Sequence, residues 1–309
     1  MATIGSARRL GRARTGGNPL RRREAWQGFL FVLPNTAGVL LFFVLPVIAA
    51  FVLGFVQWDL IQAPQWVGLG NYAALLQDPL FWIGLRNTII YTVVSVPVSV
   101  FLSLLLAIAL NTGLRERHLY RVAYFMPYVS MPVALALIWK WIYDPQLGLI
   151  DNVLSALNLP QPPWLSDASW ALPSLIIIAI WGSLGYNMIV FLAGLQGISH
   201  ELYEAASIDG TTVLTRFWYI TVPLISPATF FVLVISMINS FQVFDSVYIM
   251  TAGGPGDATR VLGLLIYQNA FQYFKMGYAA AFAWALFALV LVVTLVQVIG
   301  QKRWVHYES

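Results

Sequence analysis

Six stretches of apolar residues, each long enough to cross a bilayer as a helix, constrain the fold of this chain more than any other feature. A helix crosses about 30 Å of hydrocarbon with roughly 20 residues. The stretches span residues 29–55, 88–110, 120–142, 172–195, 224–250 and 278–299. Because backbone groups in lipid must be hydrogen-bonded within their own segment, and the stretches lack the alternation of barrel strands, they predict helices. The expected fold class is an all-α integral membrane protein with six transmembrane helices.

The composition agrees with a lipid environment. Of the 309 residues, 59% are hydrophobic and only 10% are charged, whereas about a quarter of the residues are charged in soluble domains. Cysteine is absent, which excludes disulfides and thiolate chemistry. The net charge of +4 comes from basic residues that flank the apolar stretches rather than from one continuous face. This distribution argues against binding to nucleic acid.

The basic residues also predict an orientation. Seven arginines precede the first apolar stretch, and this stretch is longer than the about 7 to 15 apolar residues of a cleavable signal, so we expect it to be retained. If this tail is cytoplasmic, thirteen of the seventeen lysines and arginines fall on that side, as the positive-inside rule requires. Both termini are therefore expected in the cytoplasm. The predicted organisation is a basic tail (1–27), a transmembrane domain (28–300) and a second tail (301–309).

The loop 196–223 is the one long polar stretch on the predicted inner face. Ser199 can cap a helix whose first turn contains Glu201 and Glu204, where acidic side chains favour the positive end of the helix dipole. Gly210 is placed to end this helix in a left-handed turn. A second short apolar stripe follows before the fifth stretch, so the loop predicts two short helices joined by a tight turn. The alternative is an amphipathic helix that lies on the membrane surface.

The spacing in this loop resembles a known motif. The sequence has Glu204, Ala205 and Ala206, then Gly210 after three residues, then Ile220 and Pro223. This pattern resembles the EAA loop of ABC importer permeases, and residues 251–255 and Asn71–Tyr72 resemble the carbohydrate branch of that family. The resemblance implies the type I ABC importer permease fold with cytoplasmic coupling helices. It assigns coupling to an ATPase to Glu201, Glu204, Ala205, Ala206, Asp209, Gly210 and Arg216.

The resemblance also implies the partners. This chain would form half of the pathway of an ATP-driven importer for a sugar or sugar derivative, beside a second permease subunit in a heterodimer. Two copies of a cytoplasmic ABC ATPase would carry ATP and Mg, and an extracytoplasmic sugar-binding protein would deliver the solute. The chain itself has no GxxxxGK[ST] phosphate loop, so no cofactor and no enzyme activity are expected on it. The expected location is the plasma (inner) membrane of a bacterium or archaeon, in contact with lipid.

Polar residues inside the apolar stretches are candidates for contact with the solute. Asp245 is the single acidic residue within a predicted span, and its spacing from Asn239 and Gln242 suggests one helix face. Amide and carboxylate groups beside aromatic rings suit hydroxyl-rich sugars. In the resembled family the region of Ser183, Tyr186 and Asn187 faces the translocation path. The alternatives are that these six residues form hydrogen bonds between helices, or that Asp245 lies near enough to the outer surface to be solvated.

Two other functional classes remain open on the sequence. An ion-coupled secondary transporter would need acidic or histidine relays in several spans, and the chain offers one such acid. A membrane-bound enzyme would need clustered acids or histidines. His118, His200 and His306 are isolated, so no metal site is expected.

Overall fold

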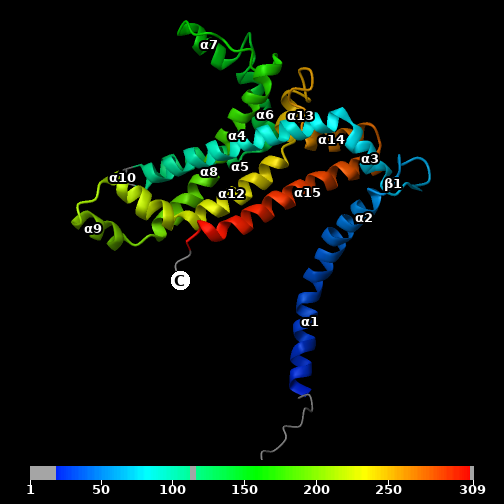
Figure 1. Cartoon of the computed structure of the whole chain (residues 1–309), viewed down its shortest axis with the longest axis horizontal. Helices are drawn as coiled ribbons and strands as arrows, with labels where there is room; N and C mark the ends of the chain where they lie inside the picture. Colours follow the sequence, from blue (N-terminus) through cyan, green and yellow to red (C-terminus); the bar gives the residue numbers. More distant parts are fainter. Residues whose placement is uncertain (1–18, 112–115, 307–309) are drawn as a thin grey trace, which may run out of the picture. The chain divides into compact units, whose positions relative to one another are not determined.

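The computed structural model describes residues 19–111 and 116–306 (Figure 1). The chain divides into two compact units, residues 1–52 and 53–309. Most of the basic tail (1–18), Arg115 and the last three residues lie outside the described residues. The first unit contains one long helix, formed by α1 (Pro19–Val39), a π-helical turn η1 (Leu40–Val44) and α2 (Leu45–Leu53). Its segment Trp26–Leu53 is long and apolar enough to cross a membrane, close to the first predicted span.

Four further segments meet the same criterion of length and apolarity. They are α4 (Pro79–Leu110), α8 (Ala168–Gly197), the interrupted segment Ser226–Met250 and the segment Met276–Arg303. The last contains α15 (Met276–Gly300) and a 3-10 turn η4 (Gln301–Arg303). Asp78 and Asp167 cap α4 and α8 by accepting the backbone N–H groups of Leu80 and Ser169. The hydroxyl and the N–H of Ser169 both donate to Asp167, and they lower the pKa of its carboxyl.

The third predicted span is not a single straight helix. It consists of α5 (Arg117–Val129) and α6 (Pro132–Ile142), which meet at an angle of 100°. Pro132 is the first residue of α6, and Met131 before it is extended, with φ −59° and ψ 123°. A residue that precedes proline is disfavoured in the helical region, and proline cannot donate to the preceding turn. The prediction of one continuous helix over 120–142 is therefore corrected to a bent pair.

The other elements are α12 (Ser226–Phe241) and α13 (Asp245–Met250), which form the interrupted segment Ser226–Met250, and short elements that connect the long helices. The short elements are β1 (Val56–Gln57), β2 (Gln65–Trp66), α3 (Gly70–Gln77), α7 (Leu149–Ala156), α9 (His200–Ile208), α10 (Val213–Arg216), the π-helical turn η2 (Phe217–Thr221), α11 (Val222–Leu224), α14 (Leu262–Tyr267) and the π-helical turn η3 (Gln268–Gln272). The two strands pair antiparallel, with Val56 opposite Trp66. Asn71 at the start of α3 donates from its amide to the carbonyls of Gly54 and Val56, both at 3.0 Å.

Small residues bring the long helices close together. A Cβ on Gly185 of α8 would lie 2.1 Å from the carbonyl oxygen of Tyr124 on α5. Ser103 of α4 donates to the carbonyl of Leu184 at 3.2 Å. Next to it, α4, α8 and α12 share an apolar cluster that includes the fully buried Phe191. Close backbone approach through Gly and Ser is typical of helix packing in membranes, where apolar burial gives no driving force.

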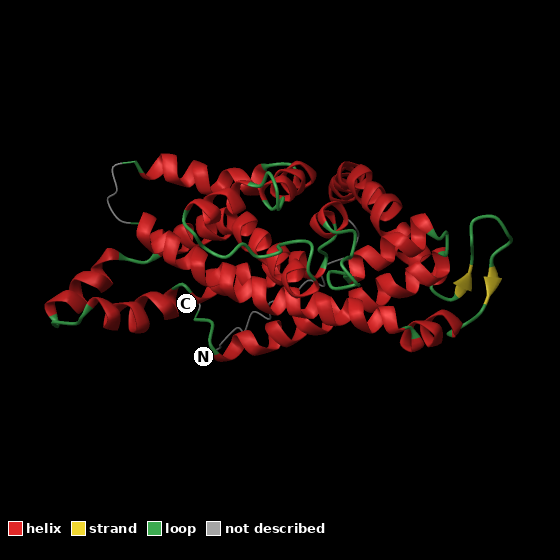
Figure 2. Cartoon of the chain, turned by 90° about the horizontal axis from the view of Figure 1, so that it is seen from above, coloured by secondary structure: helices red, strands yellow, loops and turns green. Residues whose placement is uncertain are grey.

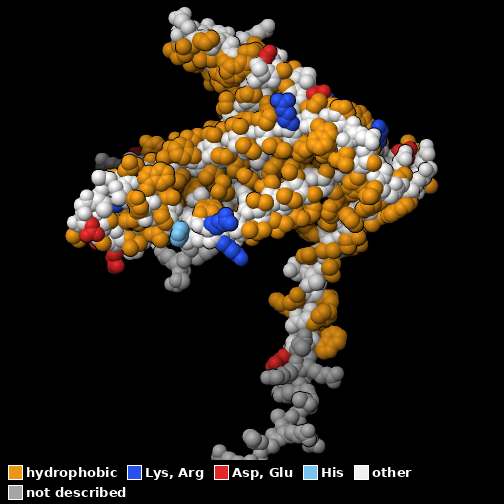
Figure 3. All heavy atoms as spheres, in the orientation of Figure 1, with side chains coloured by type: hydrophobic (Ala, Val, Ile, Leu, Met, Phe, Trp, Pro, Cys, Tyr) orange, Lys and Arg blue, Asp and Glu red, His pale blue; other side chains and the backbone are white. Residues whose placement is uncertain are grey.

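The second unit is a bundle with two different ends. The long helices α4, α8, α12 and α15 run side by side, the α9–α10 hairpin lies at one end, and the two strands with α3 lie at the other (Figures 1 and 2). Hydrophobic side chains cover most of the visible flank of this bundle (Figure 3). An apolar flank with polar segments at both ends is the surface that a bilayer requires.

Candidate functional site

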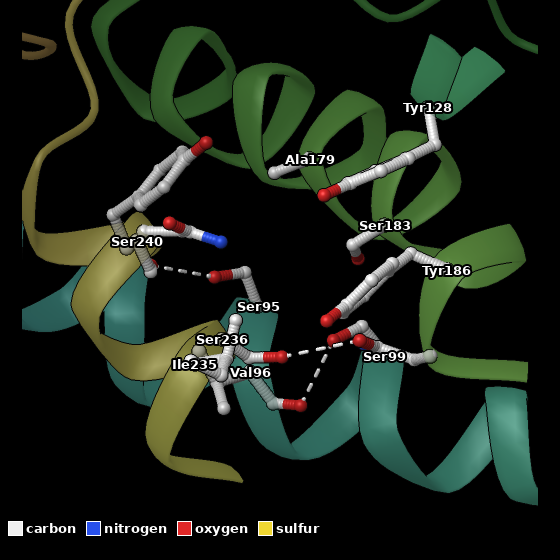
Figure 4. Close-up of a pocket in the computed structure, with 13 residues that line it drawn as sticks. Ser95, Val96, Ser99, Tyr128, Ala179, Ser183, Tyr186, Ile235, Ser236 and Ser240 are labelled. Carbon is white, nitrogen blue, oxygen red and sulfur yellow. Dashed lines mark hydrogen bonds between the residues drawn. The ribbon is translucent and has the colours of Figure 1, made fainter. Parts of the chain in front are cut away.

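A cavity opens among four helices of the second unit (Figure 4). It has a volume of about 620 Å³ including its open mouth. The lining residues come from α4 (Tyr91, Ser95, Val96, Ser99), α5 (Tyr128), α8 (Ala179, Ser183, Tyr186, Asn187) and α12 (Ile235, Ser236, Asn239, Ser240). Hydroxyl and amide groups therefore project into the interior of an otherwise apolar bundle.

Hydrogen bonds between helices hold part of this lining in place. The hydroxyls of Ser95 on α4 and Ser240 on α12 lie 3.2 Å apart, and Ser240 also donates to Thr92 at 3.0 Å. Ser236 on α12 donates to the side-chain oxygen of Asn187 on α8 at 3.4 Å. The buried amide nitrogen of Asn187 has no hydrogen-bond partner among the described residues. These contacts join α12 to both α4 and α8 beside the cavity.

Other polar groups present free acceptor capacity to the cavity. Ser99 and Ser183 donate their hydroxyl protons within their own helices, to the carbonyls of Val96 and Ile180, both at 3.0 Å. A serine oxygen that donates in this way keeps its lone pairs for a second partner. Tyr128 and Tyr186 stack with their ring centroids 4.7 Å apart at an interplanar angle of 21° (Figure 4). The stacked pair gives the cavity a flat aromatic wall with two hydroxyl edges.

The structure brings together four of the six residues expected to contact a solute. Ser183, Tyr186, Asn187 and Asn239 line the cavity, and Gln242 and Asp245 do not. The prediction that Asn239, Gln242 and Asp245 share one face of a continuous helix is wrong. The helix α12 ends at Phe241, and Asp245 is the first residue of the separate helix α13, so a spacing of three positions does not place these residues on one helix face across the break.

The contribution of α4 and α5 to the cavity was not predicted from the sequence. Tyr91, Ser95 and Ser99 come from α4, and Tyr128 comes from α5. A usable signal was present, because α4 carries small polar residues at spacings of three or four, all buried in the structure: Thr88, Thr92, Ser95, Ser99 and Ser103. Such a stripe on one face of an apolar helix marks the side that faces other protein rather than lipid.

The loop 196–223 forms the predicted helical hairpin. Ser199 caps α9 by accepting the N–H of Glu201 at 3.3 Å. Gly210 has φ +72°, which places the turn in the left-handed region that glycine adopts freely. The hydroxyls of Tyr203 on α9 and Thr221 on η2 lie 3.0 Å apart and join the two arms of the hairpin.

The hairpin presents a mixed apolar and acidic surface. Ile208, Val213 and Tyr219 are 87%, 77% and 80% exposed. Most of the residues that the resemblance assigned to coupling are exposed on this surface: Glu201, Glu204, Ala205, Asp209 and Gly210. The other two, Ala206 and Arg216, are half-buried. His200 contacts Glu204 at 3.0 Å within the first turns of α9. Large exposed apolar side chains in a polar frame mark a surface suited to a protein partner.

Metal chemistry has no geometric support in the described part of the chain. Within residues 19–111 and 116–306, no group of three or more His, Asp and Glu side chains is placed to hold a metal ion. What the site offers chemically is reversible hydrogen bonding and aromatic contact in a membrane-embedded cavity.

Comparisons with known proteins agree with this architecture. Residues 67–306 match the family described as binding-protein-dependent transport system inner membrane component. The probable ABC transporter permease protein YesP of Bacillus subtilis is 36% identical over 293 residues, which cover 93% of this chain and 94% of the relative. The lactose transport system permease protein LacF of Rhizobium radiobacter is 36% identical over 291 residues, which cover 92% and 97%.

A solved structure shows the same fold. A chain of a bacterial alginate ABC transporter, in complex with a periplasmic protein that holds an alginate pentasaccharide, superposes with a TM-score of 0.82 at 24% identity. The match covers 92% of this chain and 96% of the other. The family assignment favours a permease over the ion-coupled transporter and the membrane enzyme that the sequence left open. The chain is a multi-pass inner-membrane protein that belongs to the family of binding-protein-dependent transport system inner membrane components, the permease subunits of ABC importers, whose ATPase is a separate subunit.

Proposed function

We propose that this chain forms half of the translocation pathway of an importer for a sugar or sugar derivative, and that the cavity among α4, α5, α8 and α12 is where the solute passes. The observation that carries the proposal is the cavity itself, lined by hydroxyl and amide groups and a stacked tyrosine pair. Relatives named as transport permeases for lactose, for trehalose and maltose, and for arabinooligosaccharides support the sugar assignment.

The cavity chemistry suits weak, reversible contact with a saccharide. Sugar hydroxyls both donate and accept, so they can pair with serine oxygens and with the exposed amide of Asn239. The apolar ring faces of a sugar can lie against the tyrosine pair Tyr128 and Tyr186. A transport site must bind well enough to admit the solute and weakly enough to release it. A few neutral hydrogen bonds at about 0.5–1.5 kcal/mol each meet that requirement.

The position of the hairpin supports its role in coupling to an ATPase. It connects the end of α8 at Gly197 with the start of α12 at Ser226, and both helices line the cavity. A partner that binds α9 can therefore move both α8 and α12, which form two walls of the pathway. Closure of the ATPases on ATP would shift the equilibrium between outward-open and inward-open states, and hydrolysis would reset it. Glu201, Glu204, Ala205, Ala206, Asp209, Gly210 and Arg216 are the proposed coupling residues.

The assembly we propose has four kinds of subunit. This permease pairs with a second, related permease, two cytoplasmic ATPase copies carry ATP and Mg, and an extracytoplasmic binding protein docks at the opposite end of the bundle. The distribution of basic residues, which follows the positive-inside rule, supports a cytoplasmic location for the hairpin and both termini. The strands β1 and β2 with α3 would then face the binding protein, because they lie at the other end (Figure 1).

Reconstitution of the complete transporter tests the pathway. The variants Tyr186→Ala and Asn239→Ala remove groups that line the cavity, so ATPase stimulation by the loaded binding protein should fall at least about tenfold, a loss of roughly 1.4 kcal/mol in differential binding. Gly182→Ala is the matched control on α8, because a Cβ there has no neighbour within 4 Å. Normal stimulation and uptake in both cavity variants would refute the assignment of the pathway.

A further inference from the structure

No side chain that lines the cavity is charged at neutral pH. Relatives of this chain are named as permeases for neutral solutes and for anionic solutes. Their names include carriers for lactose and for trehalose and maltose, which are neutral, and for sn-glycerol-3-phosphate and sulfoquinovosyl glycerol, which are anionic. We infer that the solute of this chain is a neutral saccharide, and that sugar phosphates, sugar acids and sulfonated sugars are excluded by the cavity. This inference rests on the proposed function.

Two of the four helices that line the cavity are uncharged along their whole length, and the other two carry charged residues only outside the lining positions. Helices α8 and α12 contain no Lys, Arg, His, Asp or Glu. In α4 the single charged residue is Arg86, five residues before Tyr91, which is the first residue of this helix to line the cavity. In α5 the basic residues end at Arg121, seven residues before Tyr128.

An anionic solute would meet no lysine, arginine or histidine among the described residues that line the cavity. An ionised group in an apolar environment is strongly unfavourable unless it is paired, and sites that bind phosphates or carboxylates use Arg or Lys. The lining instead supplies hydroxyls, two amides and three aromatic rings, and its polar groups pair with neutral hydroxyls at little cost. Ser99 and Ser183 further favour a neutral solute over an anionic one, because their hydroxyl protons are already donated to backbone carbonyls. They therefore face the cavity mainly as acceptors, which attract sugar hydroxyls and repel an anion.

A series of variants that introduces a negative or a positive charge at Ser183 tests the inference for whichever solute the binding protein carries. The probe is the binding protein purified with its natural cargo, and the readout is ATP-driven uptake of that cargo by proteoliposomes that contain the complete transporter. Ser183→Asp and Ser183→Asn are nearly isosteric and differ in charge, as do Ser183→Lys and Ser183→Met in a longer pair. Assembly is checked for each variant by the ATPase that co-purifies with it.

With a neutral cargo, the two members of each pair should support uptake rates within about threefold of each other, because the introduced charge neither attracts nor repels a solute without net charge. With an anionic cargo, Asp should be at least about tenfold slower than Asn through like-charge repulsion, and Lys at least about tenfold faster than Met. That second pattern, even in one pair, would overturn the inference while the importer function stands. Absence of ATP-driven uptake with the unaltered chain would refute the proposed function instead.

Discussion

Gly185 sets how closely α5 can approach α8. Its ideal Cβ position is 2.1 Å from the carbonyl oxygen of Tyr124 and 2.6 Å from the Cα of Phe125, so any side chain there collides with backbone. Three residues earlier, Gly182 lies on the same helix with no atom within 4 Å of its ideal Cβ. The two positions therefore separate a packing effect from the helix propensity of glycine.

Gly185→Ala should destabilise the protein by about 1–3 kcal/mol, because the neighbouring helix must move to admit the methyl group. Gly182→Ala should be neutral or stabilising by about 0.5–1 kcal/mol, since alanine favours a helix over glycine. Thermal unfolding of the detergent-purified protein measures both changes. Equal unfolding temperatures for the two variants would show that α5 and α8 are not in backbone contact.

At the scale of elements, the hairpin 196–223 depends on one backbone conformation. Gly210 has φ +72° and open space around it, so the constraint is conformational rather than steric. An L-residue in this region costs about 1–2 kcal/mol, and asparagine tolerates it better than a β-branched residue. Gly210→Val should therefore impair ATP-driven uptake strongly, whereas Gly210→Asn should retain most of it. If valine and asparagine gave the same uptake rate, the turn would not matter for coupling.

The two arms of the same hairpin are joined by the hydroxyls of Tyr203 and Thr221, 3.0 Å apart. Tyr203→Phe should loosen this link by about 1 kcal/mol, so that amide hydrogen exchange in residues 200–208 becomes faster. Thr221→Val should have a similar effect. In the double variant the exchange should be no faster than in either single variant, because one shared bond is lost in all three. Additive effects would indicate that the two hydroxyls act through other partners.

At the scale of the whole molecule, the absence of cysteine allows the orientation to be measured directly. Single cysteines at Ser207 on α9 and Ser155 on α7 occupy exposed positions. In right-side-out vesicles a membrane-impermeant maleimide should label Ser155→Cys and leave Ser207→Cys unlabelled until detergent is added. Labelling of Ser207→Cys before detergent would place the hairpin outside and remove the basis for coupling to a cytoplasmic ATPase.

The sequence predicted the elements whose signals are local. Apolar length identified the spans, the cap at Ser199 and the glycine at 210 identified both arms of the hairpin, and the motif spacing identified the family. Local signals were insufficient where neighbouring segments decide the backbone path. Pro132 disfavours a straight helix at its position, but the 100° angle between α5 and α6 is seen only in the folded chain, where α6 also contacts α13 through the bond from Lys140 to the carbonyl of Ile249 at 3.2 Å.

By itself, the sequence determined that this chain is a helical membrane protein with a helical hairpin between two of its spans, because hydropathy, proline, glycine and capping residues act within a few positions of the chain. Only the tertiary structure decided which polar side chains share a cavity. Ser95, Tyr128, Ser183 and Asn239 are distant in sequence, and their meeting depends on how close glycine and serine let the helices pack. The break after Phe241, which separates Asp245 from the cavity, is likewise visible only in the folded chain.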